Sequence, residues 1–506
     1  LAPTAIVDPP TQAGGFRLIG REPERAQLLQ TLQEAKSGCG SLIVLDGDAG
    51  GGKTRLAEDA LGMARRQGFQ TLTGPCHEQQ GTPALIAFTE VLEEASRLMP
   101  APAFRQAMSA SAPELSKLMP ELHRLFPDMA APLHLPPELR RRYLFSSVRE
   151  FLARSSRFTP LAIFIDDLQW AEESTLQLTQ HLAQQLASLP IVVIVAYREV
   201  EASPVPETKG RFHRLLDRVR GQARDVFTPQ AVKAALDQLV GQRHARAIVL
   251  RPFTDADVQS ALASLGKAHP PARLVKSFAE RTGGNPFFVV ELFRHLKDEG
   301  RLFGARNEWV RDIDLNDVAI PDTVRVVLER RMTRVSSDTR DLLSAAAVLG
   351  HRFEPDLLEE VAEIDSARLM AALHDAERAR ILTGPSGRRD ISWRFTHLLT
   401  SQMLTTTIPQ QRRQRLHLRV ADAMTRRDHE SPVYQSGVAH HLYCAGRLAD
   451  PARTARALIA AGDAAYAMYA SEEAVPHYRR ALEVLEETNS GKGEALAAQE
   501  RLADML

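Results

Sequence analysis

The first half of the chain alternates short apolar segments with helical patterns. Strands are predicted over 41–46, 69–73, 161–166 and 191–197. Helices are predicted over about 21–36, before the first strand, and over about 53–67, 84–99 and 138–157, between the strands. Because 161–165 and 191–197 are apolar at every position, we expect strands that are buried on both faces. Such strands, separated by helices, predict a parallel sheet covered on both sides.

After about residue 250 the strand signals fade and helical patterns dominate. The final stretch has the character of a helix–turn–helix repeat of about 34 residues. Its small and aromatic positions are filled by Gly462, Ala474, Tyr478 and Ala481. Leu458 stands where tryptophan is usual, and Tyr469 stands where glycine is usual. A second repeat begins near Glu494, and an ordinary amphipathic helical hairpin is the alternative.

The N-terminal segment, the apolar segments and the cysteines indicate where in the cell the protein is expected. Residues 1–16 carry neither a basic n-region nor an apolar core, so we expect a linker, and a chain that is a fragment of a longer protein. No apolar segment approaches the roughly 20 residues of a membrane helix, so no membrane contact is expected. Three widely spaced cysteines (Cys39, Cys76 and Cys444) indicate neither a disulfide framework nor a zinc site and favour a cytoplasmic location.

Composition and charge narrow the classes of partner that the chain is expected to bind. Hydrophobic residues are 44% and charged residues 25% of the 506 residues, which is a globular composition with room for about three or four domains. The 63 basic residues balance the 63 acidic residues, so no overall positive field attracts nucleic acid or anionic lipid. We therefore do not expect this chain to bind DNA.

The strongest motif is GDAGGGKT at residues 47–54, which fits G-x-x-x-x-G-K-[ST] between a predicted strand and a predicted helix. Glycines let backbone N–H groups face a phosphate, and the helix N-terminus adds partial positive charge. Lys53 can reach the terminal phosphates, and the Thr54 hydroxyl can ligate Mg²⁺. The candidate nucleotide-binding residues of this loop are Gly47, Gly50, Gly51, Gly52, Lys53, Thr54 and Arg55. A glycine-rich turn without a ligand is the alternative.

A phosphate loop of this kind requires an acidic residue at the end of another buried strand to hold the metal ion. Asp166 ends the strand in LAIFIDDLQW and is the predicted Mg²⁺ residue, while Asp167 is placed to orient a water for attack on the γ-phosphate. Arg198 follows the strand 191–197 at the edge where α/β sheets bind ligands, and is a candidate γ-phosphate sensor. A helix cap for the aspartates and a surface position for the arginine are the alternatives.

Six motifs occur in a specific order along the chain. They are GREPE (20–24), GDAGGGKT (47–54), IFIDDLQWAEEST (163–175), AYRE (196–199), ERTGGNPFFVVEL (280–292) and RFTH (394–397). In this order they resemble the signal-transduction ATPases of the STAND class. More narrowly, they are similar to the ATPase part of MalT-like LuxR-family regulators and of multidomain nucleotide cyclases and Ser/Thr kinases. The resemblance covers about residues 17–506.

The resemblance implies a fold and a domain order. An α/β P-loop NTPase domain, with a parallel sheet and helices on both faces, would be followed by an all-α helical domain, a winged-helix domain and TPR-like helical repeats. The implied boundaries are a linker over 1–16, the P-loop domain over 17–250, the helical domain over 251–318, the winged-helix domain over 319–430 and truncated repeats over 431–506.

The resemblance also implies nucleotide contacts outside the phosphate loop. Ile19 and Gly20 would lie near the adenine, and Pro286 of the GNP stretch would pack on it. His397 of the RFTH motif would contact the β-phosphate of bound ADP and hold a closed resting form.

Two positions depart from the family pattern. Gly51 stands where an aliphatic residue is usual, which predicts a looser loop and weaker nucleotide binding. Leu398 stands where an acidic residue is common, directly after His397.

The implied function is a signalling switch with slow, Mg²⁺-dependent ATP hydrolysis. ADP would hold a closed monomer, and ATP with an inducer on the repeats would favour an open homo-oligomer. The output would come from an effector domain outside this chain, either a transcription regulator or a nucleotide cyclase or kinase. The alternatives are a DNA-binding initiator- or transposition-type ATPase that uses its winged helix, and a passive scaffold.

Other chemistry is not indicated by the sequence. It contains neither a G-x-S-x-G elbow nor an H-E-x-x-H site. His440 and His441 stand without nearby carboxylate or cysteine partners, which predicts packing within a helical repeat. The basic cluster Arg412, Arg413 and Arg415 predicts a solvated helix face.

Overall fold

The chain divides into two compact units, and each is described by itself. The computed structural model describes residues 18–76, 83–132, 136–198, 229–240, 244–298, 300–303, 309–310, 332, 335–379, 381–385, 391–396, 398–427, 432–488 and 492–503. The sheet unit comprises Glu22–Arg251, Ser431–Ser436 and Leu458–Leu506. The helical unit comprises Leu1–Arg21, Pro252–Glu430 and Gly437–Ala457.

Parallel strands form the centre of the sheet unit. Among the described residues they are β1 (Ser41–Asp46), β2 (Gln70–Thr73), β3 (Leu161–Ile165), β4 (Ile191–Tyr197) and β5 (Ala245–Val249). Their order is β2-β3-β4-β1-β5, and each neighbouring pair is parallel. The predicted parallel sheet is confirmed. Its order also places β4 between β1, which leads into the phosphate loop, and β3, which ends before Asp166.

The sequence pattern did not predict β5, and its burial explains why. Ala245 and Ile248 are buried, whereas Arg246 is exposed and forms an ion pair of 2.9 Å with Glu34. An edge strand contacts a neighbour along one side only, so it does not need a continuous apolar run. β4, at the centre, is buried at all seven positions.

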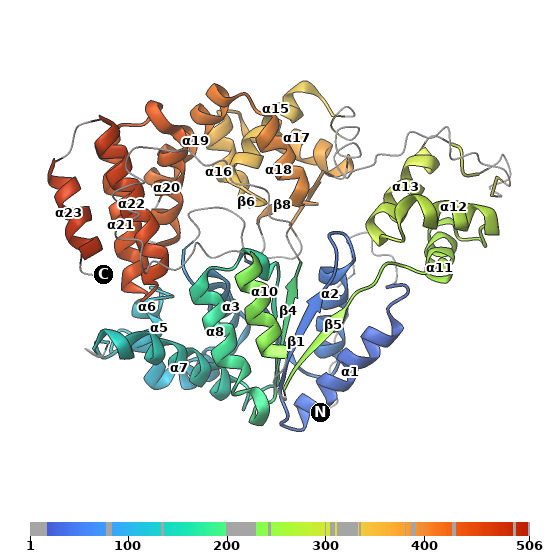
Figure 1. The fold of residues 1–506 in the computed structure, drawn as a ribbon, viewed down its shortest axis with the longest axis horizontal. Coiled ribbons are helices and arrows are strands. Elements are labelled where there is room, and N and C mark those ends of the chain that lie inside the picture. Colours follow the sequence, from blue (N-terminus) through green and yellow to red (C-terminus); the bar gives the residue numbers. More distant parts are fainter. Residues whose placement is uncertain are drawn as a thin grey trace. The chain divides into compact units, whose positions relative to one another are not determined.

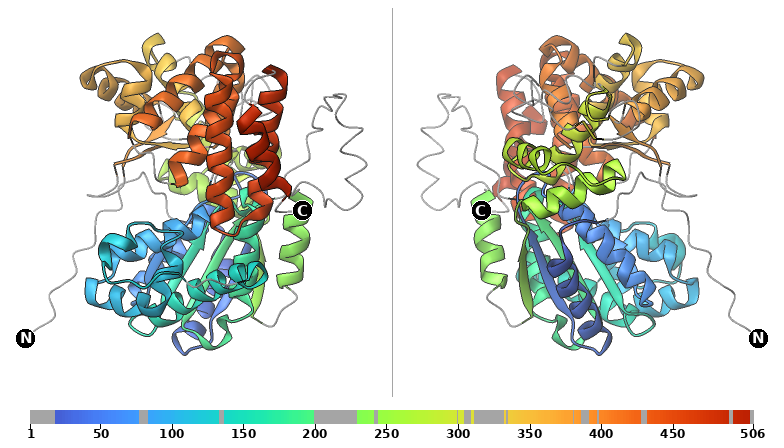
Figure 2. Two further views of the ribbon diagram at one scale, coloured as in Figure 1. Left: turned by 90° about the vertical axis from the view of Figure 1, so that its left-hand side faces the viewer. Right: turned by 90° about the vertical axis from the view of Figure 1, so that its right-hand side faces the viewer.

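Helices cover both faces of the sheet. α1 (Glu22–Lys36) and α2 (Lys53–Arg66) lie on one side, and α3 (Ile86–Leu98) and α8 (Glu173–Ala183) lie on the other (Figure 1, Figure 2). α10 (Pro229–Val240) packs against α8 and β5. A further layer of helices shares the same core: α4 (Ala101–Met108), α5 (Ala112–Leu115), α6 (Leu122–Leu125) and α7 (Pro137–Ser155). Each fully buried aliphatic side chain stabilises this arrangement by about 1.5–3 kcal/mol.

The helical unit begins with α11 (Asp255–Gly266), α12 (Ala272–Thr282) and α13 (Pro286–Asp298). A capping box starts α11, since the Thr254 hydroxyl accepts from the N–H of Asp257 and the Asp257 carboxylate accepts from the N–H of Thr254. These helices have a separate apolar core that includes Phe278 and Trp309.

The next part of the helical unit combines helices with a small antiparallel sheet. Its helices are α15 (Ser337–Leu349), α16 (Pro355–Ala362), α17 (Ser366–Arg378), α18 (Leu398–Thr407) and α19 (Gln410–Arg427). The strands β6 (Arg352–Phe353), β7 (Leu382–Thr383) and β8 (Trp393–Phe395) pair in the order β6-β8-β7. Helices with a short three-stranded sheet are compatible with the predicted winged-helix domain, whose assignment stays a prediction.

The C-terminal region is helical: α20 (Pro432–Ala445), α21 (Pro451–Ala467), α22 (Ser471–Thr488) and α23 (Lys492–Ala503). Tyr478 of α22 is fully buried against Gly462 of α21, and its hydroxyl donates to Asp463 Oδ1 at 2.7 Å. Tyr469, between the two helices, has a φ of 60°, which is the left-handed conformation that glycine favours. None of the helices in the described part of the chain combines the length and apolarity needed to span a bilayer.

The contact between Gly462 and Tyr478 generates a stability prediction. A Cβ atom on residue 462 would lie 2.7 Å from Cε1 of Tyr478, so Gly462→Ala must displace a buried aromatic ring. We expect the free energy of unfolding to fall by about 1–3 kcal/mol. Gly493→Ala is the matched control, because nothing lies within 4 Å of its Cβ position and alanine favours the helix. Urea unfolding of both variants tests this; equal stability would contradict it.

Candidate phosphate-binding site

The backbone of residues 47–54 depends on glycine at specific positions. Gly47, Gly50 and Gly52 have φ values of 153°, 78° and 95°, in the region that other residues rarely adopt. Gly51 does not share this conformation, although its Cβ position lies 3.0 Å from the carbonyl oxygen of Asp48. The backbone conformation therefore favours glycine at three positions, whereas at residue 51 a larger side chain is disfavoured by the close carbonyl oxygen of Asp48.

Lys53 begins α2, and its side chain turns back into the loop. Its Nζ atom donates hydrogen bonds to the carbonyl oxygens of Gly47 (2.6 Å) and Asp48 (3.0 Å). Burial lowers the pKa of Lys53, and the nearby carboxylate of Asp167 partly offsets that effect. A buried ammonium beside the loop N–H groups is the arrangement that binds the phosphates of a nucleotide.

Asp166 lies directly after β3 and faces the same loop. The Thr54 hydroxyl donates to Asp166 Oδ2 at 3.0 Å, and the N–H of Asp167 donates to Asp166 Oδ1 at 2.9 Å. Burial raises the pKa of Asp166 to about 7, with a second contribution from Asp167. A hydroxyl and a half-buried carboxylate are oxygen ligands that Mg²⁺ prefers, so these residues fit the predicted metal role.

Gln169 connects Asp167 to the end of β4, a role that was not predicted from the sequence. Its Nε2 atom donates to Asp167 Oδ1 at 2.6 Å, and its Oε1 atom accepts from the N–H of Arg198 at 3.1 Å. Asp167 itself has a φ of 53°, which turns the chain sharply after β3. A neutral amide within LAIFIDDLQW gives no sequence signal for this role; only the adjacency of β3 and β4 reveals it.

Arg198 follows β4, between the ends of β1 and β3. Its guanidinium lies over the Trp170 ring, with Cζ 5.6 Å from the ring centroid. Its Nε atom is buried without a hydrogen-bond partner in the described part of the chain. A buried guanidinium N–H without a partner at this edge fits the predicted role of an anion sensor, which stays a prediction.

The remaining predicted residues are placed as follows. Arg55, on α2, lies 3.5 Å from Glu58 Oε2 in an exposed ion pair. Ile19 and Gly20 belong to the helical unit, where Ile19 packs against the core of α11–α13, and Pro286 is the first residue of α13. Their contacts with adenine stay predictions. His397 lies outside the described residues, and so does the contact predicted for it.

Two half-buried glutamates, Glu172 and Glu473, lie beyond Asp167, where α8 begins. Glu172 Oε2 accepts from the Thr175 hydroxyl at 3.0 Å, and Glu473 Oε1 of α22 accepts from the N–H of Ser174 at 3.0 Å. Burial raises the pKa of Glu172 to about 8 and also raises that of Glu473. Helix α22 thus caps α8, the helix that follows the Asp166–Trp170 segment. This contact was not predicted from the sequence.

A parallel sheet of this order, with a glycine loop, a buried lysine and a threonine–aspartate pair at its carboxyl edge, defines the class of P-loop ATPases. Residues 17–194 match the family model of the AAA ATPase domain. This part of the chain is therefore an AAA ATPase domain, and the prediction of a P-loop ATPase is confirmed. Nucleotide binding is the property that this family implies. No relative was found among curated proteins.

Solved structures that match this chain at low identity include the following three proteins. One is the Signal Transduction ATPase with Numerous Domains (STAND) protein with a tetratricopeptide repeat sensor from Pyrococcus horikoshii, with 11% identity and a TM-score of 0.43; the match covers 94% of this chain and 65% of that one. The Orc1 protein of Aeropyrum pernix in complex with DNA has 13% identity and a TM-score of 0.31; the match covers 78% of this chain and 94% of that one. Drosophila ORC bound to DNA has 11% identity and a TM-score of 0.34; the match covers 80% of this chain and 96% of that one.

The raised pKa of Glu172 generates a pH prediction. Its pKa is about 8 in the folded chain, whereas an unfolded glutamate has a pKa of about 4. The folded state holds the proton more tightly, so this group lowers the free energy of unfolding as the pH rises from about 4 to about 8. The ionisable groups near it are Glu473 of α22 and Cys76 after β2.

Glu172→Gln removes this titration and keeps an acceptor for Thr175. We expect the variant to gain stability over the parent chain as the pH rises, by at least about 1 kcal/mol at pH 8. Glu173→Gln, at the next position, is the matched control and should follow the parent curve. Urea unfolding between pH 5 and pH 9 measures the difference; parallel curves for all three proteins would refute the assignment.

Proposed function

We propose that the chain is a nucleotide-dependent signalling switch of the STAND type. In this proposal ADP holds a closed resting form, and ATP together with an inducer on the C-terminal helices opens it for homo-oligomerisation. The open form controls an effector, which would be a transcription regulator or a nucleotide cyclase or kinase. The ordered motifs of the sequence and the AAA ATPase domain over residues 17–194 support the proposal.

The observation that carries the proposal is the contact of α22 with the ATPase core. Ala474 and Tyr478 of α22 belong to the same apolar cluster as β3 and β4. Glu473 caps α8, and Arg141 of α7 pairs with Glu472 at 2.8 Å. A ligand that displaced α22 would remove the cap from α8 and alter the segment that begins at Asp166. Such a contact couples the position of α22 to the segment that carries Asp166 and Asp167.

Each residue of the phosphate site has a role in this proposal. Lys53 exchanges its two carbonyl contacts for phosphate oxygens, while Thr54 and Asp166 hold Mg²⁺, which neutralises phosphate charge. Asp167, fixed by Gln169, orients the water that attacks the γ-phosphate. Hydrolysis is slow and resets the switch. Arg198 distinguishes ATP from ADP, because its guanidinium can donate to a γ-phosphate that ADP lacks.

Removal of the buried ammonium tests nucleotide binding. We expect Lys53→Ala to weaken the binding of a fluorescent ADP analogue by about 10- to 100-fold, as the loss of charge-assisted hydrogen bonds would predict. Lys36→Ala is the matched control, since Lys36 is an exposed lysine whose Nζ atom donates to the carbonyl oxygen of Gln67. Fluorescence titration gives the Kd values. Unchanged binding in Lys53→Ala would exclude the proposed site.

Neighbouring glutamates of α22 allow a test of the switch itself. Glu473→Ala removes the cap from α8, whereas Glu472→Ala removes a half-exposed ion pair that contributes little. We expect Glu473→Ala to speed the release of bound ADP several-fold and Glu472→Ala to leave it within about twofold of the parent rate. Stopped-flow fluorescence measures the release.

Limited proteolysis of the same variants gives the control for this test. If α22 becomes more accessible in Glu473→Ala and ADP release is unchanged, the coupling between α22 and the nucleotide site is wrong. Filter binding to duplex DNA at two salt concentrations tests the initiator-type alternative, which requires strong, salt-dependent affinity.

A further inference from the structure

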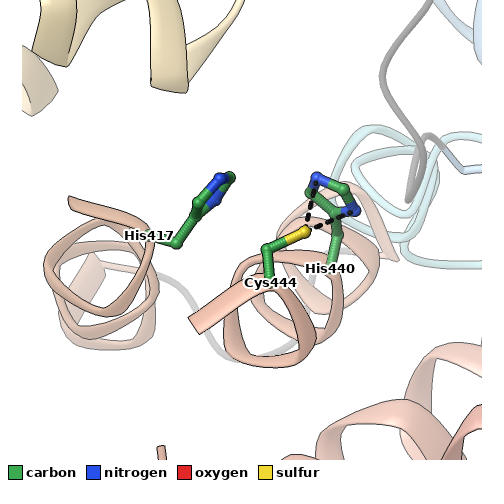
Figure 3. Close-up of side chains that lie close together, drawn as sticks. All are labelled: His417, His440 and Cys444. Carbon is green, nitrogen blue, oxygen red and sulfur yellow. Dashed lines mark hydrogen bonds between the residues drawn. The ribbon is translucent and has the colours of Figure 1, made fainter. Parts of the chain in front are cut away.

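A cluster of imidazoles and one thiol lies between α19 and α20, in the helical unit. His440 and Cys444 are four residues apart on α20 and share one face of that helix, and His417 comes from α19 (Figure 3). The ring centroids of His417, His440 and His441 are 5.1–5.9 Å apart. Packing within a helical repeat, predicted from the sequence for His440 and His441, does not account for this: Cys444 is a nearby sulfur partner.

The distances within the cluster match those between the ligands of one metal ion. One ligand atom of each of His417, His440 and Cys444 lies within 4.8 Å of the other two. Cys444 Sγ is 3.6 Å from His440 Nε2. In a tetrahedral zinc site, a sulfur and a nitrogen ligand are separated by about 3.6 Å. A side-chain adjustment of about 1 Å would bring His417 to the same spacing.

His441 supports the cluster without being a ligand. Its Nδ1 atom lies 2.8 Å from Nδ1 of His417, which is a hydrogen-bond distance and is shorter than the roughly 3.3 Å between two nitrogens on one zinc ion. When His417 donates from Nδ1, its Nε2 atom keeps the lone pair that a metal requires. A histidine ligand whose other ring N–H is held by a second group is the usual arrangement in metal sites.

We propose that His417, His440 and Cys444 bind a transition-metal ion of the zinc class, with His441 as a positioning residue. Two imidazole nitrogens and a thiolate select Zn²⁺, Co²⁺ or Cu⁺, and the absence of a carboxylate among the three ligands disfavours Mg²⁺ and Ca²⁺. Three protein ligands leave the fourth position of a tetrahedral ion to water or to an exchangeable group. The ion joins α19 to α20 and stabilises their packing.

Cobalt titration of the whole chain, after treatment with a chelator, tests the site. We expect Co²⁺ to produce a thiolate-to-cobalt charge-transfer band with one equivalent bound. Cys444→Ser should abolish the band, and His417→Ala or His440→Ala should weaken Co²⁺ binding by at least about 100-fold. His441→Ala should bind about 10- to 100-fold more weakly and keep the band, as the loss of a supporting group predicts.

Two control variants and a second readout keep the test decisive. Cys39→Ser and His374→Ala change an exposed thiol and an exposed imidazole outside the cluster, and should titrate like the parent chain. Zn²⁺ should raise the melting temperature of the parent and of both controls, but not of Cys444→Ser. Mg²⁺ should change the melting temperature of the parent and of Cys444→Ser equally. A band that survives in Cys444→Ser, or no band in the parent chain, would overturn the proposal.

Discussion

The hydrogen bond from the Thr54 hydroxyl to Asp166 Oδ2 joins two segments that are 112 positions apart in the sequence. It forms because β1, β4 and β3 are neighbours in a parallel sheet, so that their carboxyl ends meet at one edge. The register sets which atoms meet there: Ile165, the last residue of β3, pairs with Val195 of β4. A shift by one residue would turn Asp166 to the other face of the sheet and separate it from the phosphate loop.

The same edge holds several ionisable groups that are buried or half-buried and that water would otherwise solvate. Lys53 is held by loop carbonyls, Asp166 by Thr54 and a backbone N–H, and the two glutamates by donors of α8. Buried polar groups of this kind are costly unless each has a partner. In the proposed switch, a nucleotide with its Mg²⁺ would change the charge beside these groups, and the contact of Glu473 with α8 would transmit that change to α22.

The sequence predicted the features that depend on local pattern. β1 and β4 match their apolar segments residue for residue, and the glycine motif located the loop. Features that depend on neighbours in space were missed. Gln169 is an ordinary amide until β3 and β4 lie together, and Glu473 is a surface-like glutamate until α22 packs on α8. Tyr469 is the intermediate case, because its departure from the repeat pattern marked the position where the backbone has a positive φ.

The His417–His440–Cys444 cluster shows why spacing in the sequence is a weak guide to soft-metal sites in helical proteins. Two of its ligands are one helical turn apart, and the third comes from the preceding helix. Its nitrogen and sulfur donors lie in the helical unit, whereas the oxygen donors Thr54 and Asp166 lie in the sheet unit. Because Mg²⁺ prefers oxygen and zinc-class ions prefer nitrogen and sulfur, the two ions would not compete for one site. Nucleotide state and metal content could then change independently, the first acting on α8 and the second on the packing of α19 against α20.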